Sequence, residues 1–368
     1  MQRHYIEYQK LSYYKVLRQP GAFTVRNFFA FLILALCLII RVQAADSGVI
    51  TIYHHVAIDT PPSTSISPAD FRKQLDYLRD NNFNVIALDV MLDAITSGSE
   101  LPEKAVAITF DDGYISIHDT AFPMLKEYGF PFTLFLSTGP INSNLRGYMN
   151  WDQVKEMSDA GVIIANHLVE HPYMLTRLQG ESDPDWIERL RLELMQAESD
   201  ILAHTGQSHK YLAYPFGEYD KAIKEMVAAM GYLGLSQNSG AVNKSTDLLA
   251  ITRFPLTSIY SDLKTAATKL ESLAFNVSKL SPDTPVTNDH SPNVTLQFAP
   301  GKYNLDQINC FANSEAIPMQ WLDREKGIVE LVPTKTYNGR RWNYLCTAPL
   351  TGSNRYYWYS VLWIDPTV

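Results

Sequence analysis

The residues best suited to chemistry in this sequence are two adjacent carboxylates and two histidines four positions apart. Asp111 and Asp112 lie in the segment TFDDGY, and His167 and His171 lie in the segment NHLVEHP. Neighbouring carboxylates are costly to bury unless a cation compensates their charge. One of them can bind a metal ion while the other takes a proton from water, and two imidazoles can complete the ligand set. Together the four residues predict a metal-dependent hydrolytic site.

Each of these signals has a simpler explanation when it is taken alone. Asp-Asp-Gly is a common turn, and a single histidine is often a packing or surface residue. The segment 167–171 also fits the His-x-x-Glu-His motif of one class of zinc proteases, in which Glu170 would be the base on a helical face. Pro172 directly follows this motif and a β-like apolar run precedes it. Both features favour a strand that runs into a loop over a continuing helix.

A third segment, Tyr214-Pro215-Phe216-Gly217, follows another short apolar run. It offers a rigid turn with aromatic side chains and backbone amides, although the same residues also make an ordinary turn. In parallel α/β sheets, functional sites lie at the carboxyl ends of the strands. We therefore expect the three segments to meet at one site.

The elements that position these segments can be predicted from hydrophobic patterns. Residues from about 49 to 272 alternate short apolar runs with helical patterns, which is typical of an α/β fold with a parallel sheet. Helices are expected after the N-cap Ser67 and in apolar stripes that end at Gly206 and Gly231. The expected buried strands are Val49–Tyr53, Val85–Leu88, Ala105–Phe110, Phe132–Leu136, Val162–Ala165 and Tyr211–Tyr214.

The sequence changes character after about residue 272. Proline, serine and asparagine at 276–292 predict a linker that follows a catalytic domain at 46–275. Residues 293–368 contain short strand-like runs without a helical stripe, which predicts a small all-β, sandwich-like domain. These runs are Val294–Phe298, Ile328–Val332, Trp342–Cys346 and Tyr356–Ile364.

Cys310 and Cys346 are the two cysteines outside the N-terminal region. An even pair in an exported protein predicts one disulfide, with two separate buried thiols as the alternative. Trp342, Trp358 and Trp363 lie in the same region. We expect them in the core of the sandwich, with a glycan-binding surface as the alternative.

Residues 1–45 predict a signal peptide. A basic start is followed by an apolar run at 28–40, shorter than the roughly 20 residues of a membrane span, and by the small residues of a cleavage site. An uncleaved membrane anchor is the alternative, and either one places the rest of the chain in a bacterial periplasm or cell envelope. The net charge is -8 without a basic run, so nothing points to nucleic acid.

In this order, the three polar segments resemble the NodB-homology polysaccharide deacetylase family. The resemblance covers roughly residues 48–260 and extends to the flanking segments NWDQV and YHHV. It implies a distorted (β/α) barrel that holds a divalent metal, commonly zinc, with cobalt or nickel as other options. Carried over to this chain, Asp112, His167 and His171 are the metal ligands and Asp111 is the general base.

The general acid departs from the common pattern of the family. Many members carry an arginine before the turn and a late Leu-x-His, whereas Tyr214 precedes the turn here and the late histidine is missing. A subgroup that resembles the poly-β-1,6-N-acetylglucosamine deacetylases has an early Tyr-His instead, which His54 matches. His54 is therefore the expected acid and His55 the second choice, since neighbouring strand residues point to opposite faces. Arg253 is expected to replace the missing arginine near Asp111, and a role without chemistry is the alternative for all three residues.

The resemblance implies hydrolysis of N-acetyl groups on a β-linked N-acetylglucosamine polysaccharide, most closely the β-1,6-linked polymer, with release of acetate. Tyr114, Trp151 and the turn at 214–217 are expected to contact the sugar, with simple packing as the alternative. A deacetylase of peptidoglycan or chitin-type chains and an O-acetyl esterase are competing enzyme classes. A carbohydrate-binding protein without activity is the other alternative, and the presence of all four site residues argues against it.

Overall fold

The computed structural model describes residues 44–368, so the expected leader lies outside the described residues apart from its last two. Those two, Ala44–Ala45, form strand β1, which pairs with β6 (Leu101–Pro102). None of the helices in the described part of the chain is both long and apolar enough to cross a membrane.

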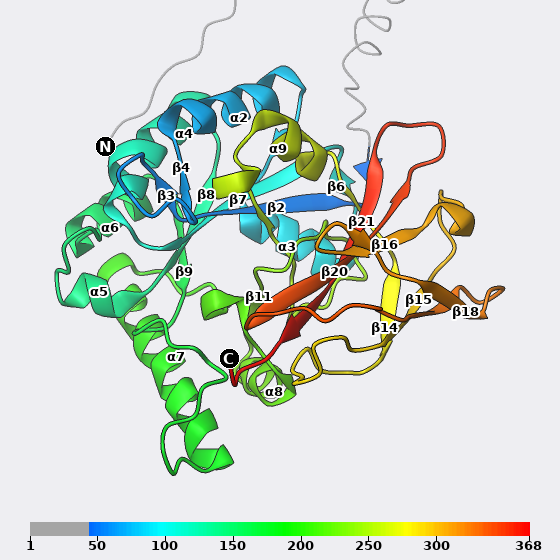
Figure 1. The fold of residues 1–368 in the computed structure, drawn as a ribbon. Helices are drawn as coiled ribbons and strands as arrows, with labels where there is room; N and C mark the ends of the chain where they lie inside the picture. The colour runs from blue at the N-terminus through cyan, green and yellow to red at the C-terminus, as the bar shows by residue number, and fades with distance from the viewer. Residues whose placement is uncertain (1–43) are drawn as a thin grey trace, which may run out of the picture. The chain divides into compact units, whose positions relative to one another are not determined.

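A parallel sheet of eight strands carries the three polar segments (Figure 1). The strands lie in the order β11-β10-β9-β8-β7-β2-β12, with β5 beside β7, and every one of these pairings is parallel. This sheet, with helices packed on it, confirms the expected distorted (β/α) barrel. The strands are β2 Gly48–Tyr53, β5 Asn84–Val85, β7 Ala105–Asp112, β8 Phe132–Leu136, β9 Ile163–Asn166, β10 Tyr211–Ala213, β11 Leu233–Leu235 and β12 Phe254–Pro255. A separate pair is formed by β3 (His55–Val56) and β4 (Ser65–Ile66).

Helices alternate with these strands, and local signals explain where several of them begin and end. Ser67 caps the first by accepting a hydrogen bond from the backbone N–H of Asp70, and Gly206 ends the longest in a left-handed conformation. The helices are α2 Pro68–Asp80, α3 Leu88–Ser97, α4 Phe122–Tyr128, α5 Thr138–Asn142, α6 Trp151–Asp159, α7 Asp183–Thr205, α8 Lys221–Ala229 and α9 Leu263–Leu270. Short helical turns are η1 Ile117–Ala121, η2 Pro215–Gly217 and η3 Ser258–Tyr260.

One expected strand, Val85–Leu88, was wrong in its extent. The structure has a two-residue strand, β5, and helix α3 already begins at Leu88. Leu88, Met91, Leu92 and Ile95 are buried at helical spacing, so this apolar segment buries one face of a helix. A short apolar run of this kind fits a buried strand and a buried helix equally well by periodicity alone.

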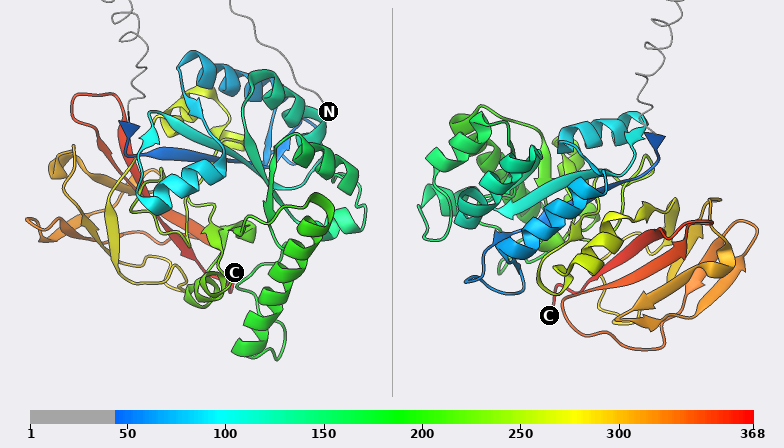
Figure 2. Two further views of the ribbon diagram at one scale, coloured as in Figure 1. Left: turned by 180° about the vertical axis from the view of Figure 1, so that it is seen from behind. Right: turned by 90° about the horizontal axis from the view of Figure 1, so that it is seen from above.

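The C-terminal residues 273–368 form strands in two sheets, drawn in yellow to red in Figure 2. One sheet has the order β14-β15-β19-β18, and the other has the order β13-β21-β20-β16-β17. We call this region the C-terminal sandwich, because side chains of both sheets share one hydrophobic core. Its elements are β13 Leu273–Ala274, β14 Val277–Ser281, β15 Val294–Phe298, η4 Leu305–Gln307, β16 Asn309–Ala312, β17 Glu315–Ala316, β18 Met319–Asp323, β19 Ile328–Leu331, β20 Arg341–Pro349 and β21 Tyr356–Ile364.

The expected disulfide is confirmed, because Cys310 and Cys346 face each other on β16 and β20 and their sulfurs are bonded. Trp342 and Trp363 are buried in the sandwich core, and Trp358 is partly buried. Burial of this kind favours the packing role that was expected for these aromatic side chains.

The C-terminal sandwich contacts the barrel at several points. The side-chain amide of Asn238 donates a hydrogen bond of 2.8 Å to the carbonyl of Ser360, and the Arg355 guanidinium donates one of 2.8 Å to the carbonyl of Glu271. The range expected as a linker contains β14, so part of it belongs to the four-stranded sheet. The boundaries expected for the domains stay a prediction.

Candidate metal centre

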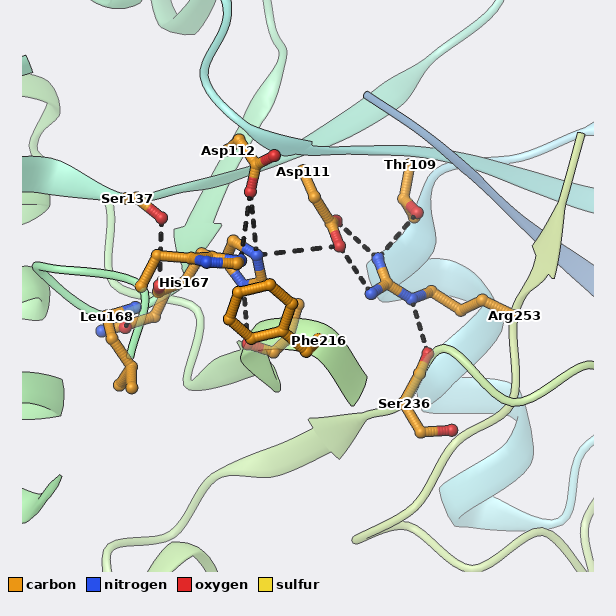
Figure 3. A network of polar contacts seen from close by, with 12 residues as sticks. Thr109, Asp111, Asp112, Ser137, His167, Leu168, Phe216, Ser236 and Arg253 are labelled. Atoms are coloured by element: carbon orange, nitrogen blue, oxygen red, sulfur yellow. Dashed lines mark hydrogen bonds and ion pairs between the residues drawn. The ribbon is translucent and has the colours of Figure 1, made fainter. Parts of the chain in front are cut away.

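The end of β7 directs its two carboxylates to different partners (Figure 3). Asp111 still has strand geometry, whereas Asp112 has a left-handed backbone with a φ of 76°. Such a conformation is uncommon for a residue with a side chain and is found where surrounding structure enforces it. Gly113 continues the turn with a φ of 99°, and a Cβ atom there would lie 2.5 Å from Leu136 Cδ1. The turn therefore requires glycine at position 113.

Asp111 forms a buried ion pair with Arg253. The guanidinium donates from Nη1 to Oδ1 at 2.6 Å and from Nη2 to Oδ2 at 2.8 Å, and both side chains are fully buried. Arg253 also donates to the Thr109 hydroxyl at 3.2 Å and to the Ser236 carbonyl at 3.0 Å. Burial raises the pKa of Asp111, but the charge and hydrogen bonds of Arg253, together with the charges of His167 and His54, outweigh it and hold the pKa below its ordinary value. Asp111 is therefore a carboxylate at neutral pH, although no solvent reaches it.

His167 follows β9 and is fully buried. Its Nδ1 lies 2.8 Å from the carbonyl oxygen of Ala213, so Nδ1–H donates to that oxygen and Nε2 carries the lone pair. Nε2 lies 3.2 Å from Oδ1 of Asp112. A hydrogen bond from the far nitrogen is the usual way in which proteins orient a histidine that binds a metal.

His171 lies on the loop after His167 and places Nε2 3.4 Å from Oδ1 of Asp112. The Glu193 carboxylate stabilises this loop by accepting hydrogen bonds of 3.0 Å from the backbone N–H groups of Val169 and Glu170. Burial and the neighbouring His167 lower the pKa of His171 to about 4. The ring is therefore neutral at neutral pH, which is the form that binds metals.

Asp112, His167 and His171 fit a divalent metal ion. Their ligand atoms lie within 4.8 Å of one another. Oδ1 of Asp112 and Nε2 of His167 are buried and form no hydrogen bond with the described residues, although they lie close together. Buried polar atoms without a partner are rare, and a metal would satisfy both. One carboxylate oxygen and two imidazole nitrogens match zinc and related metals, with further positions open to water or substrate.

His54 lies in a bend directly after β2, and His55 follows it as the first residue of β3. The sequence predicted His54 and His55 on one strand. In the structure, β2 ends at Tyr53 and β3 begins at His55. The charge of His54 contributes to the low pKa of Asp111 and of Asp112, so His54 lies near both carboxylates.

His55 is packed in a different way. Its ring stacks on Tyr114 with 3.7 Å between the ring centres. Burial and the neighbouring His54 lower the pKa of His55 to about 4. Burial and the charge of the nearby Asp112 raise the pKa of Tyr114. His54 is half-buried, whereas His55 is buried.

The residues of the turn at 214–217, which were also expected at the substrate site, differ in whether their side chains contact the metal centre. Phe216 lies against the ring of His171, with 4.5 Å between the ring centres. Tyr214 is fully buried and its hydroxyl donates to the Leu249 carbonyl at 2.9 Å, so only its backbone can face a ligand. Pro215 and Gly217 are buried within the same turn.

Trp151 lies at the start of α6 and packs away from the cluster. Its ring stacks on His204 with 4.0 Å between the centres, and Nε1 donates to the side chain of Asn142 at 2.8 Å. No contact between Trp151 and the metal centre is present among the described residues. These contacts correspond to the packing alternative for this residue.

Several residues at the centre could not be found from the sequence. Arg340 and Arg341 lie directly before and at the start of β20 in the C-terminal sandwich, and they contact the turn after β10 through Glu218 and Phe216. Tyr173 stacks on Phe216 with 3.8 Å between the ring centres. More than 120 residues separate the arginines from this turn, so no local pattern connects them.

Comparisons with known proteins agree with this geometry. The sequence model of the polysaccharide deacetylase family matches residues 98–235, which include both carboxylates, both histidines and the turn. YxkH of Bacillus subtilis is 26% identical over 207 residues, which are 55% of this chain and 69% of YxkH. A poly-β-1,6-N-acetyl-D-glucosamine N-deacetylase of Escherichia coli K12 is 23% identical over 216 residues, 49% of this chain and 32% of that protein. The chain thus spans about a third of the length of this second relative.

Solved structures show the same fold. IcaB from Ammonifex degensii is 26% identical, and the match has a TM-score of 0.54 and covers 62% of this chain and 98% of IcaB. The covered part of this chain is of the size of the barrel, and the uncovered part is of the size of residues 1–43 and the C-terminal sandwich together.

Proposed function

We propose that the barrel, whose sequence is similar to the polysaccharide deacetylase family over residues 98–235, removes N-acetyl groups from a β-linked N-acetylglucosamine polysaccharide with the aid of a metal ion. The observation that carries the proposal is the cluster of Asp112, His167 and His171 beside the ionised Asp111. A metal ion held by these three ligands would polarise the acetamide carbonyl and acidify a water molecule. The domain therefore offers both a Lewis-acid site and a fixed carboxylate at one strand end.

Asp111 would take the proton from the attacking water. Its carboxylate is 3.9 Å from Nε2 of His167, which puts it at the edge of the metal centre. Arg253 keeps it ionised and fixes its orientation through two hydrogen bonds. A base with a low pKa accepts a proton only from an acidified water, and a metal ion held by Asp112, His167 and His171 would supply that acidity.

His54 would donate a proton to the leaving amine. It lies near both carboxylates, and its Nδ1 is buried without a hydrogen-bond partner among the described residues. The backbone N–H of Tyr114 donates to no backbone carbonyl of the described residues, so it can donate to the developing oxyanion.

The β-1,6-linked polymer is the substrate that we favour, because relatives named for this polymer match the barrel and because His54 lies beside the carboxylates. Zinc is the metal that we favour for a site of one carboxylate and two imidazoles, with cobalt or nickel as alternatives. A polysaccharide substrate also agrees with the export that residues 1–45 predict.

The test is acetate release from defined oligomers. Purified residues 44–368 should release acetate from β-1,6-linked N-acetylglucosamine oligomers faster than from β-1,4-linked ones. Faster release from the β-1,4-linked oligomers would favour a chitin-type or peptidoglycan substrate. Release from an O-acetylated sugar alone would identify an esterase, and binding of either oligomer without release would identify a carbohydrate-binding protein.

A further inference from the structure

The two histidines of the metal centre are held in place in different ways. His167 donates a hydrogen bond of 2.8 Å to the Ala213 carbonyl, which fixes both its rotation and its tautomer. Within residues 44–368, no protein group forms a hydrogen bond with the His171 ring. Its edge packs against Phe216 instead, with an angle of 66° between the rings. The His171 ring also packs against the ring of His167, with 4.7 Å between the ring centres, so its orientation depends on packing against His167 and Phe216.

Phe216 is itself held in an unusual conformation. Its backbone has a φ of 58°, in the left-handed region that a residue with a side chain seldom adopts. Tyr173 covers the ring in a parallel stack with 3.8 Å between the centres and an angle of 6°. The carbonyl of Phe216 accepts a hydrogen bond from Arg341. Contacts from outside the turn thus maintain this conformation.

Arg340 of the C-terminal sandwich completes the stack. Its guanidinium lies over the Tyr173 ring, 4.5 Å from the ring centre, as in a cation–π contact. It also donates to both carboxylate oxygens of Glu218, at 2.6 and 2.8 Å. Glu218 is fully buried and follows Gly217 directly, so the ion pair joins the sandwich to the turn that carries Phe216.

We propose that the C-terminal sandwich is part of the metal centre, with Arg340 as a positioning residue that fixes His171 through Tyr173 and Phe216. The inference rests on the proposed function, since it takes His171 as a metal ligand. It deepens that function by giving the sandwich a role: the sandwich shapes the metal affinity of a site to which it contributes no ligand.

Zinc affinity of the metal-free protein is the direct measurement. Loss of a group that orients a metal ligand typically weakens metal binding by about 10- to 100-fold. Zinc titrated calorimetrically into metal-free residues 44–368 should bind about 10-fold more weakly when Tyr173→Leu removes the middle layer of the stack. Tyr173→Phe keeps the aromatic layer and should retain the affinity of the wild type.

A second variant tests the ion pair without leaving a buried charge unpaired. The double substitution Glu218→Gln and Arg340→Met removes both charges and should also weaken zinc binding by about 10-fold. Arg355→Ala is the matched control. Arg355 also joins the sandwich to the barrel, through a hydrogen bond of 2.8 Å to the Glu271 carbonyl, but it touches no member of the stack. Thermal unfolding of each metal-free variant shows that it is folded.

The outcomes separate this inference from the proposed function. Wild-type zinc affinity in both Tyr173→Leu and the double variant would overturn the role of the sandwich and leave the metal centre intact. An equal loss in Arg355→Ala would also overturn it, because the effect would then come from a general loosening of the sandwich. Failure of the wild type to bind zinc would overturn the proposed metal centre, and this inference with it.

Discussion

The buried ion pair between Asp111 and Arg253 gives a prediction that can be worked out from the structure. Arg253→Met removes the guanidinium and leaves Asp111 in a fully buried position without a cation. Breaking a buried pair in this way typically costs about 3–5 kcal/mol, because the remaining charge has lost its solvent and its partner. The free energy of unfolding of metal-free Arg253→Met should therefore fall by about 3–5 kcal/mol at pH 8.

The cost should depend on pH with a definite sign. In the wild type the pKa of Asp111 is lowered, so the pair contributes stability above the unfolded pKa of about 3.9, and this is lost as pH falls through the folded pKa. In Arg253→Met burial acts on Asp111 without the opposing arginine and raises its pKa. The folded variant then binds a proton more readily than the unfolded chain, so its deficit should be smaller at pH 5 than at pH 8.

Urea unfolding followed by circular dichroism measures these differences. The double variant Asp111→Asn and Arg253→Met carries no buried charge and should recover most of the lost stability. Arg72→Met is the matched control, because Arg72 forms the same two-bond contact with Glu127 on the surface. Exposed pairs of this kind contribute little. A deficit in Arg253→Met no larger than that in Arg72→Met would refute the reasoning.

Three further predictions concern other parts of the chain. His54→Gln should lower kcat by about 10²- to 10⁴-fold, as loss of a general acid does, and His55→Gln should lower it less; equal losses in acetate-release assays would reject this assignment. Reducing the disulfide, which closes a loop of 36 residues, should lower the unfolding free energy by about 4 kcal/mol in urea titrations, and an unchanged midpoint would contradict this. His290 pairs with Asp365 at 2.9 Å, which raises the pKa of His290, so this contact stabilises below about pH 6.5 and is lost as pH rises through the raised pKa. The melting temperature of His290→Gln should therefore differ from that of the wild type more at pH 5.5 than at pH 8.5, and the reverse order would contradict the contact.

The carboxylates and histidines of the centre could be found from the sequence because each set is local. Asp111 and Asp112 are adjacent, and His167 and His171 lie on one short loop, so a single strand end carries each set. Parallel strand order then brings the two ends to the same edge of the sheet. The apolar runs predicted β7, β8 and β9 to within two residues, whereas the pairing of these strands follows from the fold.

Contacts that hold the metal centre in place from distant parts of the sequence could not be predicted in this way. Arg340 meets Glu218 across 122 residues, and neither residue lies in a pattern that distinguishes it from a surface charge. Arg253 was expected near Asp111 only through the resemblance, and the two-bond pair across 142 residues follows from the fold. The bend at His54 was missed for a different reason, since the apolar run ends at Tyr53 and periodicity gives no information beyond it.

Restoring zinc to the metal-free protein tests the central claim most directly. Acetate release from a β-1,6-linked N-acetylglucosamine oligomer should be absent after chelation, should rise with added zinc until about one equivalent is bound, and should stay absent in Asp112→Ala at the same zinc concentration. Full activity in the chelated protein, or in Asp112→Ala, would contradict the claim that Asp112, His167 and His171 hold the metal on which the reaction depends.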